Sequence, residues 1–103
     1  MVTHIVAWRL KDSALGNPKA ENARLMRAKL EALPGQIPGL LHLEVGFDFS
    51  ATENSSDVVL VTRFATRADL AAYQIHPAHQ AVGTFVREVV AERRLVDYET
   101  LGT

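Results

Sequence analysis

The chain has 103 residues, a net charge of -1, 48% apolar residues and no cysteine. This length and composition fit one globular domain over residues 1–103, with a core that needs no disulfides. The lack of cysteine excludes thiolate catalysis and cysteine-bound zinc or iron–sulfur sites. The interspersed charges favour neither nucleic acid nor an anionic membrane as a partner.

The chain opens on a predicted strand. Residues 3–10 alternate between two faces, a period of two that is typical of a strand. One face carries His4, Val6, Trp8 and Leu10. We see no signal peptide before this strand and no apolar run long enough to span a bilayer, so we expect a cytoplasmic protein.

A helix is predicted next. Asn17 is suited to the N-cap position and Pro18 to the first helical position, and the helix should reach about Leu33, just before Pro34-Gly35. Its apolar stripe consists of Ala23, Met26, Leu30 and Leu33.

Two strands joined by a polar turn form the predicted middle of the chain. Residues 41–47 alternate after Pro38-Gly39, and residues 50–56 are polar turn formers. Residues 58–64 begin with an apolar run that is typical of a central strand covered on both faces. The short connection predicts a hairpin.

The last third predicts two helices and a strand. Thr66 and Asp69 have the spacing of a capping box, which opens a helix ending near Ile75. Pro77 would clash inside a continuous helix, so a break is expected at His76. The second helix then runs from Pro77 to about Glu92 on the spacing of its apolar residues, and residues 94–99 form the final strand.

This order of elements predicts an α+β, ferredoxin-like βαββαβ fold with an antiparallel four-stranded sheet. Helices would cover one face of that sheet only. The other face would expose Ile5, Ala7, Val59, Val61 and Val96. Because an exposed apolar patch usually marks an interface, we expect a homodimer that packs sheet against sheet.

The segment 73–80, Tyr-Gln-Ile-His-Pro-Ala-His-Gln, concentrates groups that can move protons. An imidazole titrates near neutral pH, and a phenol can donate a hydrogen bond to a carbonyl oxygen. His79 falls in the same helical row as Val82 and Val86, so burial should keep it neutral, as a general base must be. Tyr73 would then stabilise an oxyanion.

The same residues also have purely structural interpretations. His79 could pack or cap without reacting, and Tyr73 could be a core tyrosine bonded to backbone. His76 fits the helix cap before Pro77, and His4 could be a hydrogen-bonded core histidine beside Trp8. The residues leave both interpretations open.

No cofactor or metal is expected. His76 and His79 have no carboxylate at a helpful spacing, and the chain lacks a glycine-rich phosphate loop and a serine in a nucleophile elbow. Five arginines are interpreted as solvated or paired rather than as an anion site: Arg63, Arg67, Arg87, Arg93 and Arg94.

Three segments give the chain a family resemblance: residues 3–12, residues 73–79 and residues 95–99. Together they resemble the stress-responsive A/B barrel (Dabb) family, whose fold is a dimeric α+β barrel. The resemblance implies no single activity, because many members have no known reaction. The wider superfamily of dimeric barrels includes cofactor-free monooxygenases.

Some plant members are polyketide cyclases that close a ring by intramolecular aldol condensation. In those enzymes a His matching His79 is the base, a Tyr matching Tyr73 holds a carbonyl oxygen, and a His matching His4 lies near the pocket. This chain departs from them at Asp57-Val58, where the plant cyclase has a further pocket histidine.

Three functions follow as hypotheses. The first is a cofactor-independent lyase or cyclase acting on a carbonyl-rich, polyketide-like or phenolic metabolite, with His79, Tyr73 and His4 as catalytic residues and Trp8 and His76 as substrate contacts. The second is a non-enzymatic dimer that binds a small hydrophobic or phenolic ligand. The third is a cofactor-free monooxygenase.

Overall fold

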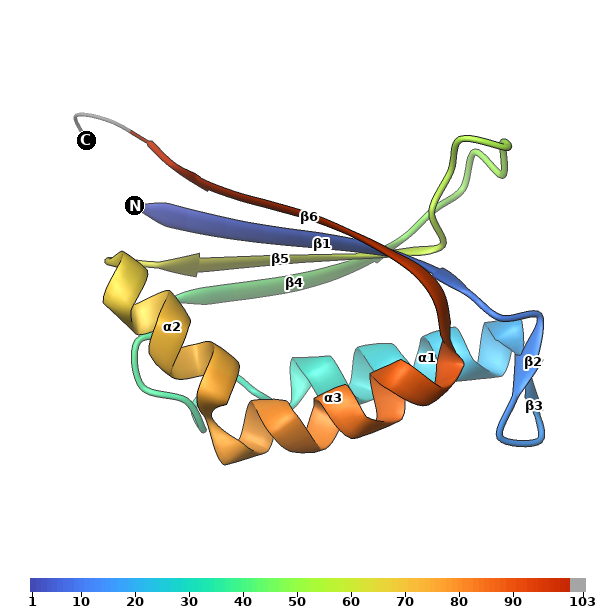
Figure 1. Cartoon of the computed structure of the whole chain (residues 1–103), viewed down its shortest axis with the longest axis horizontal. Coiled ribbons are helices and arrows are strands. Elements are labelled where there is room, and N and C mark those ends of the chain that lie inside the picture. Colours follow the sequence, from blue (N-terminus) through green and yellow to red (C-terminus); the bar gives the residue numbers. More distant parts are fainter. Residues whose placement is uncertain (101–103) are drawn as a thin grey trace.

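A four-stranded antiparallel sheet carries every helix of the described chain on one face (Figure 1). The computed structural model describes residues 1–100. The sheet strands, in spatial order, are β4 (His42–Phe47), β5 (Val58–Phe64), β1 (Val2–Leu10) and β6 (Val90–Glu99). The helices are α1 (Lys19–Glu31), α2 (Arg67–Ile75) and α3 (Pro77–Val89). This is the predicted ferredoxin-like α+β fold.

The alternation predicted for β1 is confirmed, and it sets the inner face of the sheet. His4, Val6 and Trp8 are all buried. In an antiparallel pair, residues directly opposite each other point to the same face. Asp97 lies opposite His4 and Arg93 lies opposite Trp8, so both β6 residues belong to the inner face as well.

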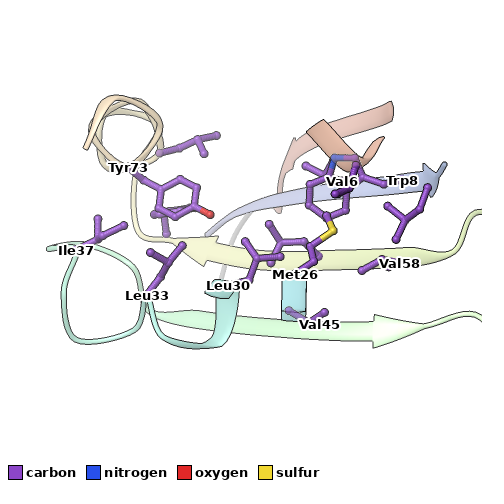
Figure 2. Close-up of a cluster of buried hydrophobic side chains, with 14 of the residues drawn as sticks. Val6, Trp8, Met26, Leu30, Leu33, Ile37, Val45, Val58 and Tyr73 are labelled. Atoms are coloured by element: carbon purple, nitrogen blue, oxygen red, sulfur yellow. The ribbon is translucent and has the colours of Figure 1, made fainter. Parts of the chain in front are cut away.

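The core lies between the inner face of the sheet and the helices (Figure 2). Met26 and Leu30 of the predicted α1 stripe are buried, and so is Leu33 just beyond the helix. β5 is a central strand, as its apolar run predicts, because it pairs with β1 on one side and β4 on the other.

The predicted start of the first helix is wrong. Asn17 does not cap it, because Asn17–Pro18 is a two-residue strand, β3, paired with β2 (Ser13–Ala14). Positive φ angles of 54° at Leu15 and 78° at Gly16 close this tight hairpin. Helix α1 therefore begins at Lys19, and it ends at Glu31 rather than Leu33.

The predicted break between the last two helices is confirmed, but the end of the second is wrong. His76 separates α2 from α3, and the Thr66 hydroxyl accepts from the Asp69 amide, 3.1 Å away, at the start of α2. Helix α3 ends at Val89 rather than Glu92, and β6 begins at Val90 rather than Arg94. β-Branched side chains favour strands, and Val90 already pairs with Leu10.

The outer face of the sheet has no helical cover within residues 1–100 (Figure 1). The predicted apolar residues lie on this face: Ile5, Ala7, Val59 and Val61 are partly exposed, and Val96 is exposed. Tyr98, which pairs with Thr3, shares the face. In the same part of the chain, no helix has the length and apolar character that crossing a membrane requires.

Candidate active-site cavity

A cavity of about 510 Å³ lies between helix α3 and the inner face of β1. This volume falls within the range of small-molecule sites. Most of its wall is apolar, with residues such as Val6, Leu60 and Val86. Five side chains in the wall carry polar or charged groups: His4, Trp8, His79, Arg87 and Arg93.

His79 stands in the first turns of α3 and faces the cavity. Val82, Val86 and Val90, the other members of its predicted row, line the same cavity. The Nδ1 atom lies 3.1 Å from the Gln74 carbonyl oxygen, so an Nδ1–H donates to it and Nε2 keeps a lone pair. This is the tautomer in which Nε2 can accept a proton.

The surroundings of His79 favour neutral imidazole. Burial lowers its pKa below the ordinary value of 6.5, and the nearby His4 and Arg93 lower the pKa further, while the bond to Gln74 opposes the shift. At pH 7 the side chain is therefore largely unprotonated, which is the state that a general base requires.

His4 projects from β1 into the cavity wall, and a hydrogen bond to a residue of β6 holds its ring in place. It is buried, and its Nδ1 lies 2.5 Å from Oδ1 of Asp97, its cross-strand neighbour. The bond orients the ring, as a carboxylate commonly does for a histidine. His4 is thus both a hydrogen-bonded core histidine and part of the cavity wall.

Tyr73 lies beside both histidines but is not in the wall. Its ring centroid is 4.5 Å from that of His79 and 6.2 Å from that of His4. The hydroxyl is buried with no hydrogen-bond partner among the described residues, and burial raises the Tyr73 pKa to about 12. The phenol therefore stays protonated at neutral pH, and its O–H is available to donate a hydrogen bond.

The two predicted substrate contacts lie in different places. Trp8 lines the cavity, and its indole Nε1 is buried without a partner in the described chain. Figure 2 shows its ring in the core layer close to Val6. His76 is outside the wall, and its Nδ1 accepts a hydrogen bond from the Ala78 amide at 3.0 Å, which caps α3.

Several residues of the site were missed by sequence reasoning. Strand register and helix packing bring Asp97, Arg87 and Arg93 to the site, and no local sequence pattern predicts either of them. Asp57 accepts from the Leu10 amide at 2.8 Å and lies 3.3 Å from the Lys19 ammonium, so it ties the β1 end to α1. Within residues 1–100 no cluster of three or more potential metal ligands is found.

The family comparison matches nearly the whole chain. A family model described as the stress-responsive A/B barrel domain (Dabb) matches residues 2–100. No curated protein matches the sequence.

Solved structures share the fold. A dimeric protein of unknown function and ferredoxin-like fold from Bacteroides fragilis is 31% identical, with a TM-score of 0.85, and the match covers 96% of this chain and 95% of that one. The hydroxynitrile lyase from Passiflora edulis is 16% identical, with a TM-score of 0.82 and coverage of 99% and 94%. A putative antibiotic biosynthesis monooxygenase from Nitrosomonas europaea is 21% identical, with a TM-score of 0.76 and coverage of 99% and 100%. At these identities the last two similarities concern the fold alone.

Proposed function

Because the chain belongs to the stress-responsive A/B barrel domain family, we propose that its cavity carries out cofactor-independent lyase or cyclase chemistry on a carbonyl-rich, polyketide-like or phenolic metabolite. One observation carries the proposal. His79, with its Nδ1–H anchored on Gln74 and its pKa lowered, presents a neutral imidazole in the wall of an apolar cavity of about 510 Å³.

The proposed step is proton abstraction next to a carbonyl. Nε2 of His79 takes a proton from the α-carbon, and the electron pair of the broken C–H bond moves to the carbonyl oxygen to give an enolate. The enolate carbon then attacks a second carbonyl of the same molecule, forming a carbon–carbon bond and closing the ring. The resulting alkoxide takes the proton back from His79, so the base is regenerated.

The other predicted residues have supporting roles in this proposal. The protonated Tyr73 hydroxyl, without a protein partner, is the proposed donor to the enolate oxygen once a ligand reaches it. His4, oriented by Asp97, is an auxiliary polar contact, and Trp8 contributes apolar wall. His76 acts at a distance from the cavity by fixing the start of the helix that carries His79.

The test measures proton abstraction without the natural substrate. 4-Hydroxyacetophenone is incubated with the protein in D₂O, and loss of its methyl proton signal is followed by NMR. We expect exchange faster than in buffer, and we expect His79→Ala to return the rate to the buffer level while the thermal unfolding curve stays cooperative. Wild-type exchange at the buffer rate, with the ketone shown to bind, would contradict the enzymatic proposal.

Ligand binding without turnover is the second candidate, and a specific observation favours it. The Tyr73 hydroxyl is covered and lies outside the cavity wall, so an oxyanion donor is not yet in place. In this case His79→Ala should change ligand affinity and stability but no reaction rate. Oxygen uptake with a hydroquinone would instead favour the third hypothesis, a cofactor-free monooxygenase.

We also propose a homodimer formed through the outer sheet face, with the cytoplasm as its location. The uncovered apolar row of Ile5, Val59, Val61 and Val96 supports the dimer. The Bacteroides fragilis protein, described as dimeric, also supports it.

A further inference from the structure

Two arginines stand out among the residues that line the cavity. Arg87 and Arg93 are exposed, whereas every other lining residue is buried or partly buried. A side chain that belongs both to the cavity wall and to the outer surface lies at the cavity opening. The opening is therefore bounded by a guanidinium from α3 and another from β6.

The fold directs both side chains to this place. Arg93 lies opposite Trp8 in the antiparallel pair, so it shares the inner face with a residue of the cavity wall. Arg93 lines the same cavity as His79. Burial is the main cause of the lowered His79 pKa, and the positive charge of Arg93 adds a smaller effect in the same direction. Arg87 folds back over Gly83: a Cβ built at Gly83 would lie 3.2 Å from the Arg87 Nη1. Glycine in a helix interior costs about 1 kcal/mol relative to alanine, and here it leaves room for the guanidinium beside the helix backbone.

Neither guanidinium is neutralised by the described chain. Arg24, Arg67 and Arg94 each form an ion pair with a glutamate. Neither Arg87 nor Arg93 has a carboxylate within 4.0 Å in residues 1–100.

The polar contacts and nearby carboxylates of these two residues lead to the same conclusion. The one side-chain hydrogen bond found for Arg87 in the described residues is a long 3.4 Å contact with the Thr84 hydroxyl. The inner-face carboxylate of β6, Asp97, is already bonded to His4. Glu92, next to Arg93, is bonded to Arg94 at 2.7 Å.

We propose that Arg87 and Arg93 bind an anionic group of the ligand at the cavity opening, so that the ligand class is an apolar, carbonyl-bearing molecule with a carboxylate or phosphate at one end. The apolar body would fill the valine-rich wall, and the anion would stay at the rim. Arginine suits this role because its planar guanidinium can give two parallel hydrogen bonds to a carboxylate or phosphate. The inference rests on the proposed function, because it assigns a ligand class to the same cavity.

The arrangement also explains how an acidic protein would attract an anion. The chain has a net charge of -1, so its average field does not favour anionic ligands. Two cations beside an apolar cavity create a local positive potential, and low-dielectric walls focus it at the opening. That potential would act on binding and on orientation, and would place the far end of the ligand near His79.

The test uses a pair of probes that differ in charge. 4-Butylbenzoate and 4-butylbenzamide have nearly the same shape, but only the first is an anion at neutral pH. Binding is followed by the emission of Trp8, which lies in the cavity wall and is the single tryptophan of the chain, and by titration calorimetry. We expect the benzoate to bind about tenfold more tightly than the amide, a ratio that corresponds to one charge-assisted contact.

Substitutions locate the preference on the protein. Arg87→Gln and Arg93→Gln should each weaken benzoate binding about three- to tenfold and leave amide binding unchanged, and the double variant should abolish the preference. Arg24→Gln, which removes one cation paired with Glu21 on α1, is the matched control and should alter neither affinity. 4-Butylphenyl phosphate, run in parallel, tells a phosphate-bearing ligand from a carboxylate, and tighter binding of either anion than of the amide supports the inference.

Failure of the anion inference and failure of the proposed function give different binding results. Equal binding of benzoate and amide, or an undiminished preference in the double variant, would overturn the anion inference while leaving the cavity as a ligand site. Absence of binding by all three probes, in both emission and heat, would overturn this inference and the proposed function together.

Discussion

The buried Tyr73 hydroxyl has no hydrogen-bond partner within residues 1–100, and a buried polar group without a partner destabilises the folded state. We therefore expect Tyr73→Phe to raise the free energy of unfolding by about 1 kcal/mol, because the desolvation cost disappears while the ring packing against Phe64 stays. Urea denaturation at neutral pH measures the change.

Ser50→Ala removes a hydroxyl from an exposed residue outside the sheet, so it is the control for this prediction and should leave stability unchanged. A loss of stability in Tyr73→Phe would show that the hydroxyl has a partner in solution. If the hydroxyl also supports the proposed enolate, the same variant should exchange ketone protons about 10²-fold more slowly, the effect of losing one oxyanion donor. If Tyr73→Phe is more stable but exchanges ketone protons more slowly, the Tyr73 hydroxyl contributes to the reaction at a cost in stability.

His79 should show a pH signature of its own. Burial lowers its folded-state pKa below 6.5, the ordinary value that the unfolded chain is expected to keep. Between these two pKa values the unfolded state binds a proton that the folded state does not. The contribution of His79 to the free energy of unfolding is therefore fully present above about pH 6.5. It declines as the pH falls through 6.5 towards the folded-state pKa.

Two measurements check this prediction. The His79 ring signal in an NMR titration should have its midpoint below pH 6.5. Unfolding curves from pH 7.5 to about 5.5 should show a shallower loss of stability for His79→Gln than for the wild type. A midpoint at or above 6.5 would contradict the neutral base at the centre of the proposed mechanism.

At the scale of elements, the joint between α2 and α3 depends on His76. This residue ends one helix and caps the next, where its Nδ1 accepts from the Ala78 amide at 3.0 Å. We expect His76→Ala to reduce the free energy of unfolding by about 1 kcal/mol, the usual cost of losing an N-cap acceptor.

His76→Asn is the matched variant for the cap. Asparagine is also a good N-cap residue, so it should restore most of the stability lost in the alanine variant. Thermal unfolding of the three proteins gives the comparison. Equal stabilities would show that Pro77 alone fixes the break. If both variants fold like the wild type but bind 4-butylbenzoate more weakly, His76 would instead be supported as a substrate contact.

At the scale of the molecule, the outer face of the sheet provides the prediction on assembly. Val61 lies on this uncovered face and is partly exposed. We expect Val61→Lys to convert the proposed dimer to a folded monomer, because a charge placed in an apolar interface loses its hydration without gaining a partner. Light scattering coupled to size-exclusion chromatography reports the mass.

Ala72→Lys is the control for assembly, because Ala72 is exposed on α2, a helix on the opposite face of the sheet. This variant should keep the dimeric mass. A wild-type protein with monomer mass, or a Val61→Lys variant that stays dimeric, would contradict an interface on this face.

The sequence by itself determined most of the elements, because the signals for them are local. The period of two in residues 3–10 placed His4 and Trp8 on the buried face, and Pro77 set the break at His76. The family resemblance followed from the same short segments. Boundaries failed where local signals compete, as at Val89 and Val90, where helical spacing gives way to strand pairing with Leu10.

The tertiary structure alone decided which side chains meet. Asp97 lies 93 residues from His4 in sequence, and only the register of β6 against β1 brings them together. The same register brings Arg93 to the cavity opening, where sequence reasoning had interpreted it as solvated or paired. The lack of a hydrogen-bond partner for the buried Tyr73 hydroxyl is also a tertiary property, because it depends on all the elements that pack around the ring. Local sequence specifies helices and strands through short-range sterics and hydrogen bonds, whereas a cavity and its charges depend on contacts between segments far apart in the chain.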